Sequence, residues 1–219
     1  MDDLALLAQS DLFSAFTTEE LRRVLASAVP MSCSRNDVIF SEGDDGDRLY
    51  VVRTGRVAIA KRSPDGRESV LALMEPGDLF GEMALFDGEP RSADGRALET
   101  SELLSVPFGP IKTVLEERPH LLWDVVALIS RRLRVENAAL ADSVFLDVTG
   151  RTAKRLLELA GENDEFLLPI TQEELAGLVG ASRERVNKAI SAFVRLGWID
   201  QVDRRYRITD RTQLTRRAR

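Results

Sequence analysis

The sequence predicts an α+β protein: an N-terminal β-rich domain of the jelly-roll type, a long coiled-coil helix and a C-terminal winged helix–turn–helix domain. Three observations predict it. Short apolar runs broken by glycine turns fill residues 31–106, a heptad repeat occupies residues 122–143, and a two-helix pattern followed by a hairpin lies within residues 170–209. The expected domains are 1–109, 110–146 and 147–219.

Composition argues against a membrane protein, a secreted protein and a zinc protein. The chain has 219 residues, of which 44% are hydrophobic, enough for one large or two small domains. No segment approaches the ~18 apolar residues of a membrane helix. The first residues are acidic where a secretory signal carries Lys or Arg, so a cytoplasmic protein without a membrane partner is expected. One cysteine and one histidine allow no internal disulfide and make a zinc site unfavourable.

Charge is distributed unevenly along the chain. The net charge is −6, but residues 1–146 carry 16 Lys/Arg and 25 Asp/Glu, a net of −9. From Arg183 onward there are 11 basic and 4 acidic residues, a net of +7. Opposite signs in the two parts favour two domains with different partners, and the basic one is a candidate for binding a polyanion.

The N-terminal region begins with helices and continues as strands. Residues 2–29 are expected to form short helices, one of them capped at Thr17. Strands are expected at 38–40, 49–52, 56–60, 69–73 and 102–106, with turns at 42–47, 54–56, 63–67 and 75–78. Asp65-Gly66 predicts a tight hairpin turn.

Helical periodicity returns between Pro110 and Phe145. Positions spaced by four and three residues form a seam of about three heptads. The seam consists of Leu122, Val126, Ile129, Leu133, Glu136, Leu140 and Ser143. The alternative is a helix that packs only on its own domain. An acid at Glu136 costs stability unless it has a partner. Two copies of Glu136 in a paired seam are expected to repel each other unless Arg132, one turn earlier, screens them.

The C-terminal part follows a helix–turn–helix pattern. Asp147 is placed to cap a first helix, and Thr171 with Glu174 forms a capping box before a short helix over 172–178. Gly180 suits the turn, and Ser182 caps a second helix. A hairpin around Asp203-Arg204 would be the wing.

The leading edge of the second helix is polar. Arg and Lys can donate hydrogen bonds to guanine, and Glu can accept one from cytosine. A helical hairpin with a merely solvated face is the alternative. The expected DNA-contacting residues are Thr171, Gln172, Ser182, Arg183, Glu184, Asn187 and Lys188.

The segment GEMALFDGEPRSA (81–93) predicts an anion site. Backbone N–H groups of Gly81, Glu82, Met83 and Ala84, at the start of a short helix, can surround a phosphate. Arg91 offers charge-assisted donors and Ser92 offers a hydroxyl. The carboxylate of Glu82 can accept from a sugar hydroxyl, so a nucleotide is expected. The alternative is that Arg91 only pairs with Glu82.

The order of these motifs, with FLDVTGR (145–151) between the long helix and the SRERVNKAI helix (182–190), resembles the cyclic-AMP receptor protein branch of the CRP/FNR transcription regulators. The RERVNKAI run resembles the actinobacterial-type members more closely. The resemblance implies an N-terminal β-roll that binds a cyclic nucleotide, and a homodimer. Gly81, Glu82, Arg91 and Ser92 match the family's phosphate cassette.

The resemblance also assigns roles on two helices. Glu136 and Asn137 fall where the family's dimer helix reads the purine, although the enterobacterial pattern has hydroxyl residues there. Arg183, Glu184 and Lys188 fall on the base-reading face, with Lys188 in place of an arginine.

The expected function is therefore a cyclic-AMP-responsive transcription regulator, not an enzyme. Its implied partners are double-stranded DNA with TGTGA-like palindromic half-sites, a second copy of the chain and RNA polymerase. A ligand-independent or cyclic-GMP-responsive regulator is one alternative. An enzyme with a cupin-like barrel is a more remote one.

Overall fold

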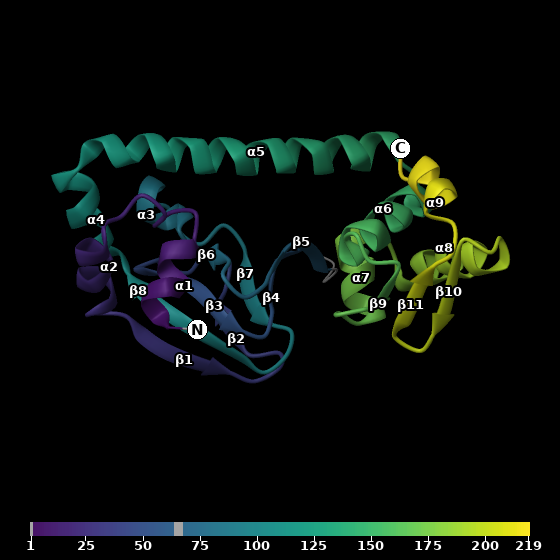
Figure 1. The fold of residues 1–219 in the computed structure, drawn as a ribbon, viewed down its shortest axis with the longest axis horizontal. Coiled ribbons are helices and arrows are strands. Elements are labelled where there is room, and N and C mark those ends of the chain that lie inside the picture. Colours follow the sequence, from purple (N-terminus) through teal and green to yellow (C-terminus); the bar gives the residue numbers. More distant parts are fainter. Residues whose placement is uncertain (1, 64–67) are drawn as a thin grey trace. The chain divides into compact units, whose positions relative to one another are not determined.

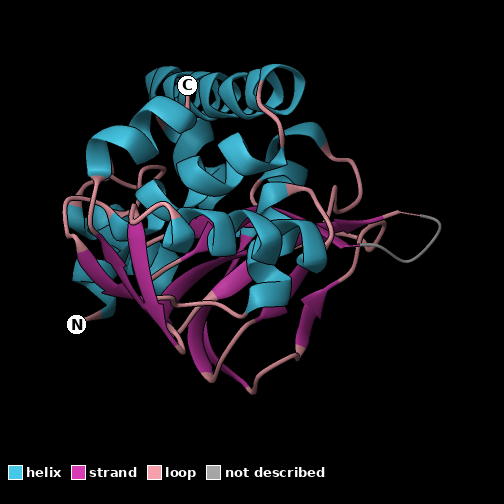
Figure 2. Cartoon of the chain, turned by 90° about the vertical axis from the view of Figure 1, so that its right-hand side faces the viewer, coloured by secondary structure: helices cyan, strands magenta, loops and turns pink. Residues whose placement is uncertain are grey.

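The computed structural model describes residues 2–63 and 68–219, and these form two compact units (Figure 1). The first unit holds the described residues up to 133 except 68–70, and the second holds 68–70 and 134–219. Both contain helices and strands, which Figure 2 draws in different colours. The division falls within the long helix rather than at residue 146. The boundaries of the three expected domains remain a prediction. None of the helices described is both long and apolar enough to cross a membrane.

The first unit is a two-sheet β-roll flanked by helices. One sheet has the order β1-β8-β3-β6 and the other β2-β7-β4-β5. Two of its elements, β5 and α5, are shared with the second unit. The elements in chain order are α1 (Asp3–Gln9), α2 (Thr18–Leu25), β1 (Val29–Cys33), β2 (Val38–Phe40), β3 (Arg48–Thr54), β4 (Val57–Arg62), β5 (Glu68–Met74), β6 (Leu79–Phe80), α3 (Met83–Asp87), β7 (Asp94–Ala97), β8 (Ser101–Pro107), α4 (Phe108–Glu117), the 3₁₀ turn η1 (Pro119–Leu121) and α5 (Leu122–Phe145).

Every expected strand is present, and three more strands complete the sheets. The additional strands have weak sequence signals. β1 contains Pro30, which an edge strand tolerates, β6 has only two residues, and β7 reads Asp-Gly-Arg-Ala. The capping box at Thr17 and Glu20 is confirmed. The hairpin turn expected at Asp65-Gly66 lies outside the described residues.

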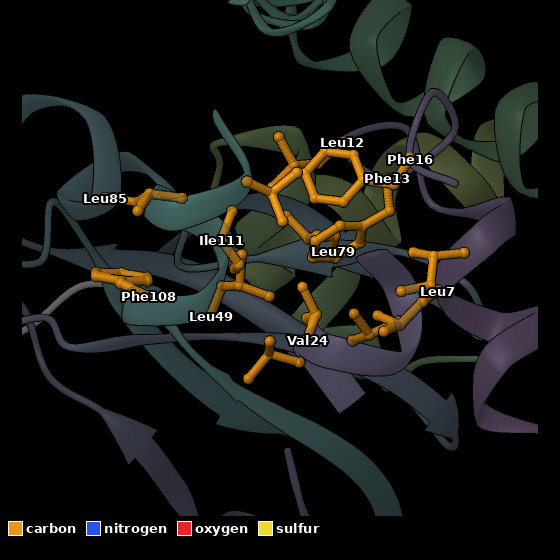
Figure 3. Packing of buried hydrophobic residues seen from close by; sticks show 14 of the residues in the cluster. Leu7, Leu12, Phe13, Phe16, Val24, Leu49, Leu79, Leu85, Phe108 and Ile111 are labelled. Atoms are coloured by element: carbon orange, nitrogen blue, oxygen red, sulfur yellow. The ribbon is translucent and has the colours of Figure 1, made fainter. Parts of the chain in front are cut away.

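The central strands β3 and β8 of sheet β1-β8-β3-β6 are buried on both faces, whereas the edge strand β1 is mostly exposed. Along β3, Leu49 and Val51 point to a cluster that also contains apolar residues of α1, α2, α4 and α5, and Figure 3 shows part of it. Tyr50 and Val52 point to a second cluster between the two sheets. Successive side chains of a strand alternate between faces, so a strand covered on both sides reads as an unbroken apolar run.

The helical region expected from Pro110 to Phe145 is interrupted. α4 ends at Glu117, and Arg118 has a φ of −131° and a ψ of 71°. A proline disfavours helical backbone in the residue before it, so Pro119 accounts for the break. η1 then leads into α5, which ends at Phe145 as expected.

The second unit, apart from residues 68–70 and the end of α5, is a winged helix–turn–helix domain. Its three strands are ordered β10-β11-β9. The elements are α6 (Val148–Ala160), β9 (Glu165–Leu167), α7 (Gln172–Val179), α8 (Arg183–Arg195), β10 (Ile199–Val202), β11 (Arg205–Ile208) and α9 (Arg211–Arg217). The turn residue Gly180 has a φ of 66°, the left-handed region that favours glycine. Asp203 turns the wing with a φ of 53°. β9 was not expected from the sequence.

The start of α6 is fixed from two sides. As predicted, the carboxylate of Asp147 caps the helix, accepting from the backbone N–H of Gly150 at 2.8 Å. The Arg217 guanidinium of α9 also pairs with this carboxylate. The Gly150 hydrogen bond and the Arg217 ion pair hold the pKa of Asp147 below its ordinary value. The C-terminal helix therefore helps to fix the segment that joins α5 to α6.

We predict that Asp147→Ala lowers the free energy of unfolding by about 1–2 kcal/mol, because the cap is lost. Asp147→Asn keeps a capping oxygen and loses only the exposed ion pair, so it should cost less than about 1 kcal/mol. A carboxyl with a lowered pKa stabilises the folded state above its unfolded pKa, and this contribution disappears as the pH falls. Urea unfolding between pH 7 and pH 3 should show parent and Asp147→Asn converging in acid. A constant difference would contradict the assignment.

Candidate nucleotide and DNA sites

The cassette begins where β6 ends. Gly81 follows Phe80 with a φ of +79°, and a Cβ there would lie 2.8 Å from Nη1 of Arg91. Only glycine combines this backbone with so close an approach. Glu82 comes next, and α3 starts at Met83. The first N–H groups of a helix have no partner within it, so this backbone presents donors beside Arg91.

Arg91 is the central side chain of the cassette. It is only 5% exposed. Its Nη1 donates to the carbonyl of Gly81 at 2.5 Å and its Nη2 to the carbonyl of Arg48 at 2.7 Å. The guanidinium carbon lies 4.4 Å from the ring centre of Phe40. Its Nε is buried and has no hydrogen-bond partner.

A buried guanidinium with no carboxylate partner is costly unless other groups compensate it. Two carbonyl dipoles and a cation–π contact to Phe40 provide part of that compensation here. The donor left over at Nε gives Arg91 capacity for a further acceptor. An anion beside it would supply both the acceptor and the missing negative charge.

Glu82 is the second buried charge, at 6% exposure. Its Oε1 pairs with Nη1 of Arg132 on α5, and Nη2 of Arg132 donates to the carbonyl of Leu79 at 3.0 Å. Burial raises the pKa of the Glu82 carboxyl, and the positive charge of Arg132 opposes that rise. The alternative interpretation paired Glu82 with Arg91, whereas the structure pairs Glu82 with Arg132.

The structure brings together six of the eight expected nucleotide contacts: Gly81, Glu82, Met83, Ala84, Arg91 and Ser92. The hydroxyl of Ser92 lies 3.5 Å from the sulfur of Met83. Glu136 and Asn137 are exposed on the part of α5 that belongs to the second unit. Their role toward a nucleotide remains a prediction.

The exposed edge of α8 forms the candidate DNA interface. Ser182 caps the helix by accepting from the N–H of Arg185 at 3.4 Å. Val186, Ala189, Ile190 and Phe193 are buried in the domain. Arg183, Glu184 and Lys188 are exposed and Asn187 is half-buried. The side chains expected to read bases therefore lie away from the core.

Thr171 and Gln172 already have partners within the domain. The Thr171 hydroxyl accepts from the N–H of Glu174 at 3.2 Å, which completes the expected capping box. The Gln172 amide donates to the Tyr206 hydroxyl at 2.6 Å. Contacts of these two residues with DNA remain a prediction.

Part of the positive charge after Arg183 serves the fold. Arg211 bonds the carbonyls of Gly161 and Asn163 and pairs with Asp164. Arg217 pairs with Asp147. The net charge of +7 thus overstates the charge available for phosphates.

Two features of the cassette were not predicted from the sequence: the aromatic rings beside Arg91 and the ion pair between Glu82 and Arg132. Phe40 and Tyr50, from two different strands, lie within 6 Å of the Arg91 guanidinium carbon. Arg132 lies 50 residues after Glu82. The one available signal was that Arg132 lies off the heptad seam, on the same face of the helix as the apolar residues Val125 and Leu128.

Comparisons with known proteins match both parts of the chain. Residues 30–118 match the model of the cyclic nucleotide-binding domain, and residues 150–217 match that of the Crp-like helix–turn–helix domain. A CRP-like cAMP-activated global transcriptional regulator from Mycobacterium tuberculosis is 38% identical over the full length of both chains.

The chain belongs to the CRP/FNR family of transcription regulators. The Cyclic AMP receptor protein of Thermus thermophilus is 35% identical over 86% of this chain and 87% of that protein. The structure of the c-di-GMP-responsive global regulator CLP from Xanthomonas campestris superposes with a TM-score of 0.75 at 25% identity, covering 88% of this chain and 99% of that one.

Family membership confirms the expected fold and class of function. This CRP/FNR member is a DNA-binding, cyclic-nucleotide-responsive transcription regulator, and the cupin-like enzyme is set aside because the family consists of regulators. Its similarity to the Mycobacterium protein agrees with the expected likeness to actinobacterial members.

We predict that Arg132→Ala destabilises the first unit by about 1–3 kcal/mol at pH 7.5, because Glu82 is left buried without its charged partner. Loss of Arg132 raises the pKa of Glu82 further, so the variant loses stability as the pH rises through that pKa. Its deficit relative to the parent should shrink toward pH 5. Arg132→Ala combined with Glu82→Gln is the control, and its unfolding midpoint should not show this pH dependence. An equal deficit at both pH values in the single variant would contradict the pairing.

Proposed function

We propose that this chain is a homodimeric regulator whose effector is cyclic AMP, bound at residues 81–92. The observation that carries the proposal is Arg91, a buried guanidinium with an unpartnered Nε beside the first N–H groups of α3. This combination favours a phosphate over a neutral ligand. The names of the Mycobacterium and Thermus relatives support cyclic AMP.

Each cassette residue has a role in this proposal. Arg91 donates to the cyclic phosphate, together with the backbone of Gly81, Met83 and Ala84 and the hydroxyl of Ser92. Glu82 accepts a hydrogen bond from the ribose hydroxyl. Because Glu82 is held by Arg132, its carboxylate has a fixed position before the ligand arrives.

Glu136 and Asn137 are proposed to contact the purine from α5. An ionised carboxylate only accepts hydrogen bonds, and the exocyclic amine of adenine can donate one. Guanine offers two adjacent donors, so cyclic GMP is a second candidate effector. CLP is described as responsive to c-di-GMP, which makes that nucleotide a third ligand to test.

The proposed mechanism is a population shift. A nucleotide that binds one arrangement of the paired α5 helices more tightly than another biases the dimer toward it. In the favoured arrangement the two α8 helices would enter successive major grooves about 34 Å apart on a palindrome of TGTGA-like half-sites. We place this activity in the cytoplasm, with RNA polymerase as the downstream partner.

Direct base reading is assigned to Arg183, Glu184 and Lys188. Arg183 and Lys188 are suited to guanine O6 and N7, and Glu184 to the amine of cytosine. A ligand-independent DNA-binding dimer is the alternative function, and the buried Arg91 with its spare donor argues against it.

We predict that Arg91→Ala weakens cyclic AMP binding by tenfold or more, since a charge-assisted hydrogen bond is worth about 1.5–3 kcal/mol. Isothermal titration of the parent and variant with cyclic AMP, cyclic GMP and c-di-GMP measures this directly and ranks the three ligands. Arg53→Ala, which removes an arginine paired with Asp3 outside the cassette, is the matched control. Equal affinity of Arg91→Ala and the parent would refute the cassette assignment.

We predict that Arg183→Ala costs about 1–3 kcal/mol in DNA affinity and relaxes preference at one guanine. Binding to all single-base variants of one half-site, at fixed salt, provides the test. Arg205→Ala on the wing is the control, and it should weaken all sequences alike if it contacts phosphates. If Arg183→Ala retained the parent's ranking of the variants, α8 would not be aligned as proposed.

A further inference from the structure

α5 presents three different faces to its surroundings. Val125 and Leu128 are buried in the helix-side core of the first unit, and Arg132 on the same face holds Glu82. The seam residues Leu122, Val126, Ile129 and Leu133 are 44–58% exposed. Trp123 belongs to neither set and is 76% exposed. Trp123 thus extends the exposed apolar surface of Leu122 and Val126, and a contiguous exposed apolar patch that includes an indole is typical of a surface that binds another protein.

The helical wheel places Trp123 on one particular flank. At about 100° per residue, the face that packs on the chain's own β-roll lies roughly a quarter turn to one side of the seam. Trp123 lies roughly a quarter turn to the other side. Two parallel α5 helices paired along the seam are related by a two-fold axis, which puts the partner's β-roll on the Trp123 side.

A groove that could hold the Trp123 side chain of a second copy lies at the level of Leu122 along α5. Leu122, the residue before Trp123, lines a shallow groove of about 280 Å³. Its other apolar walls are Leu85 and Phe86 of α3, Leu115 of α4 and Pro119 of η1, with Lys112 and Glu116 also lining it. Since a two-fold parallel to the helices keeps equivalent residues level, the second copy's Trp123 lies level with this groove.

The chemistry of the groove suits an indole. Its apolar walls cover the ring faces, the carboxylate of Glu116 can accept from the indole N–H, and the ammonium of Lys112 can lie over the ring. Tryptophan is also among the residue types that dominate the energetics of interfaces.

We infer that Trp123 of a second copy of this chain inserts into the groove between α3, α4 and η1, and that two such reciprocal insertions anchor the dimer beside the nucleotide cassette. The inference rests on the homodimer of the proposed function. It adds a contact between the long helix of one protomer and the cassette helix of the other, outside the heptad seam.

Tryptophan fluorescence tests the location of the ring. The chain has two tryptophans, and Trp198 stacks on Phe193 at 5.7 Å, so Trp198→Phe keeps an aromatic ring there and leaves Trp123 as the sole reporter. At concentrations where sedimentation shows a dimer, the Trp123 emission should be blue-shifted and poorly quenched by iodide, and dilution to monomer should reverse both. A dimer in which Trp123 stays red-shifted and freely quenched would overturn the inference alone. A chain that never dimerises would overturn the homodimer as well.

Dimer dissociation constants test the energetics. Trp123→Ala should weaken the dimer at least tenfold. Val135→Ala is the matched control, because Val135 is 67% exposed on α5 but lies on the side opposite the seam, and it should change the constant less than twofold. An unchanged constant for Trp123→Ala would overturn the inference.

A double-mutant cycle identifies the groove as the binding place. Phe86→Ala should also weaken the dimer, and combining it with Trp123→Ala should add less than the two separate effects predict. If Phe86→Ala lowers the helical signal in circular dichroism, the exposed Glu116→Ala takes its place in the cycle. If the effects of Trp123→Ala and of the folded groove variant on the dimer dissociation constant were strictly additive, the indole would bind elsewhere and the inference would be overturned.

Discussion

The ion pair between Glu82 and Arg132 is the constraint on which the site depends. It joins the loop that starts the cassette to the helix that leaves the β-roll. Glu82 is buried, where an unpartnered carboxylate would be costly, whereas the side chain of Arg132 is half-exposed. The pair therefore fixes the direction of Glu82 and also commits one face of α5 to its own unit. Because that face of α5 packs on the first unit, the heptad seam on the adjacent face remains exposed.

The surroundings of Arg91 suit the anion site of the proposed function. The carbonyls of Gly81 and Arg48 and the ring of Phe40 hold the guanidinium in place. None of them is a carboxylate, so a phosphate that binds here would not have to break a salt bridge. Displacing a carbonyl costs less than separating opposite charges in a buried setting, which favours reversible binding.

The sequence predicted those parts of the fold that rest on local rules. Alternating apolar residues, the cap at Asp147 and the left-handed turn at Gly180 each act within a few residues. The partners of Arg91 and Glu82 depend on which strands and helices meet, and no local pattern encodes that Arg132 reaches back to residue 82. Pro119 was a local signal for the helix break at Arg118. The break was missed because the helical spacing of apolar residues continues on both sides of it.

The position of α9 has a practical consequence for handling the protein. Its Arg217 pairs with the carboxylate of Asp147, which caps α6. An affinity tag or fluorescent fusion attached directly to Arg219 is therefore expected to disturb this ion pair, and with it the segment that joins α5 to α6. Fusions at the N-terminal end, or after a long flexible spacer, would leave that joint undisturbed.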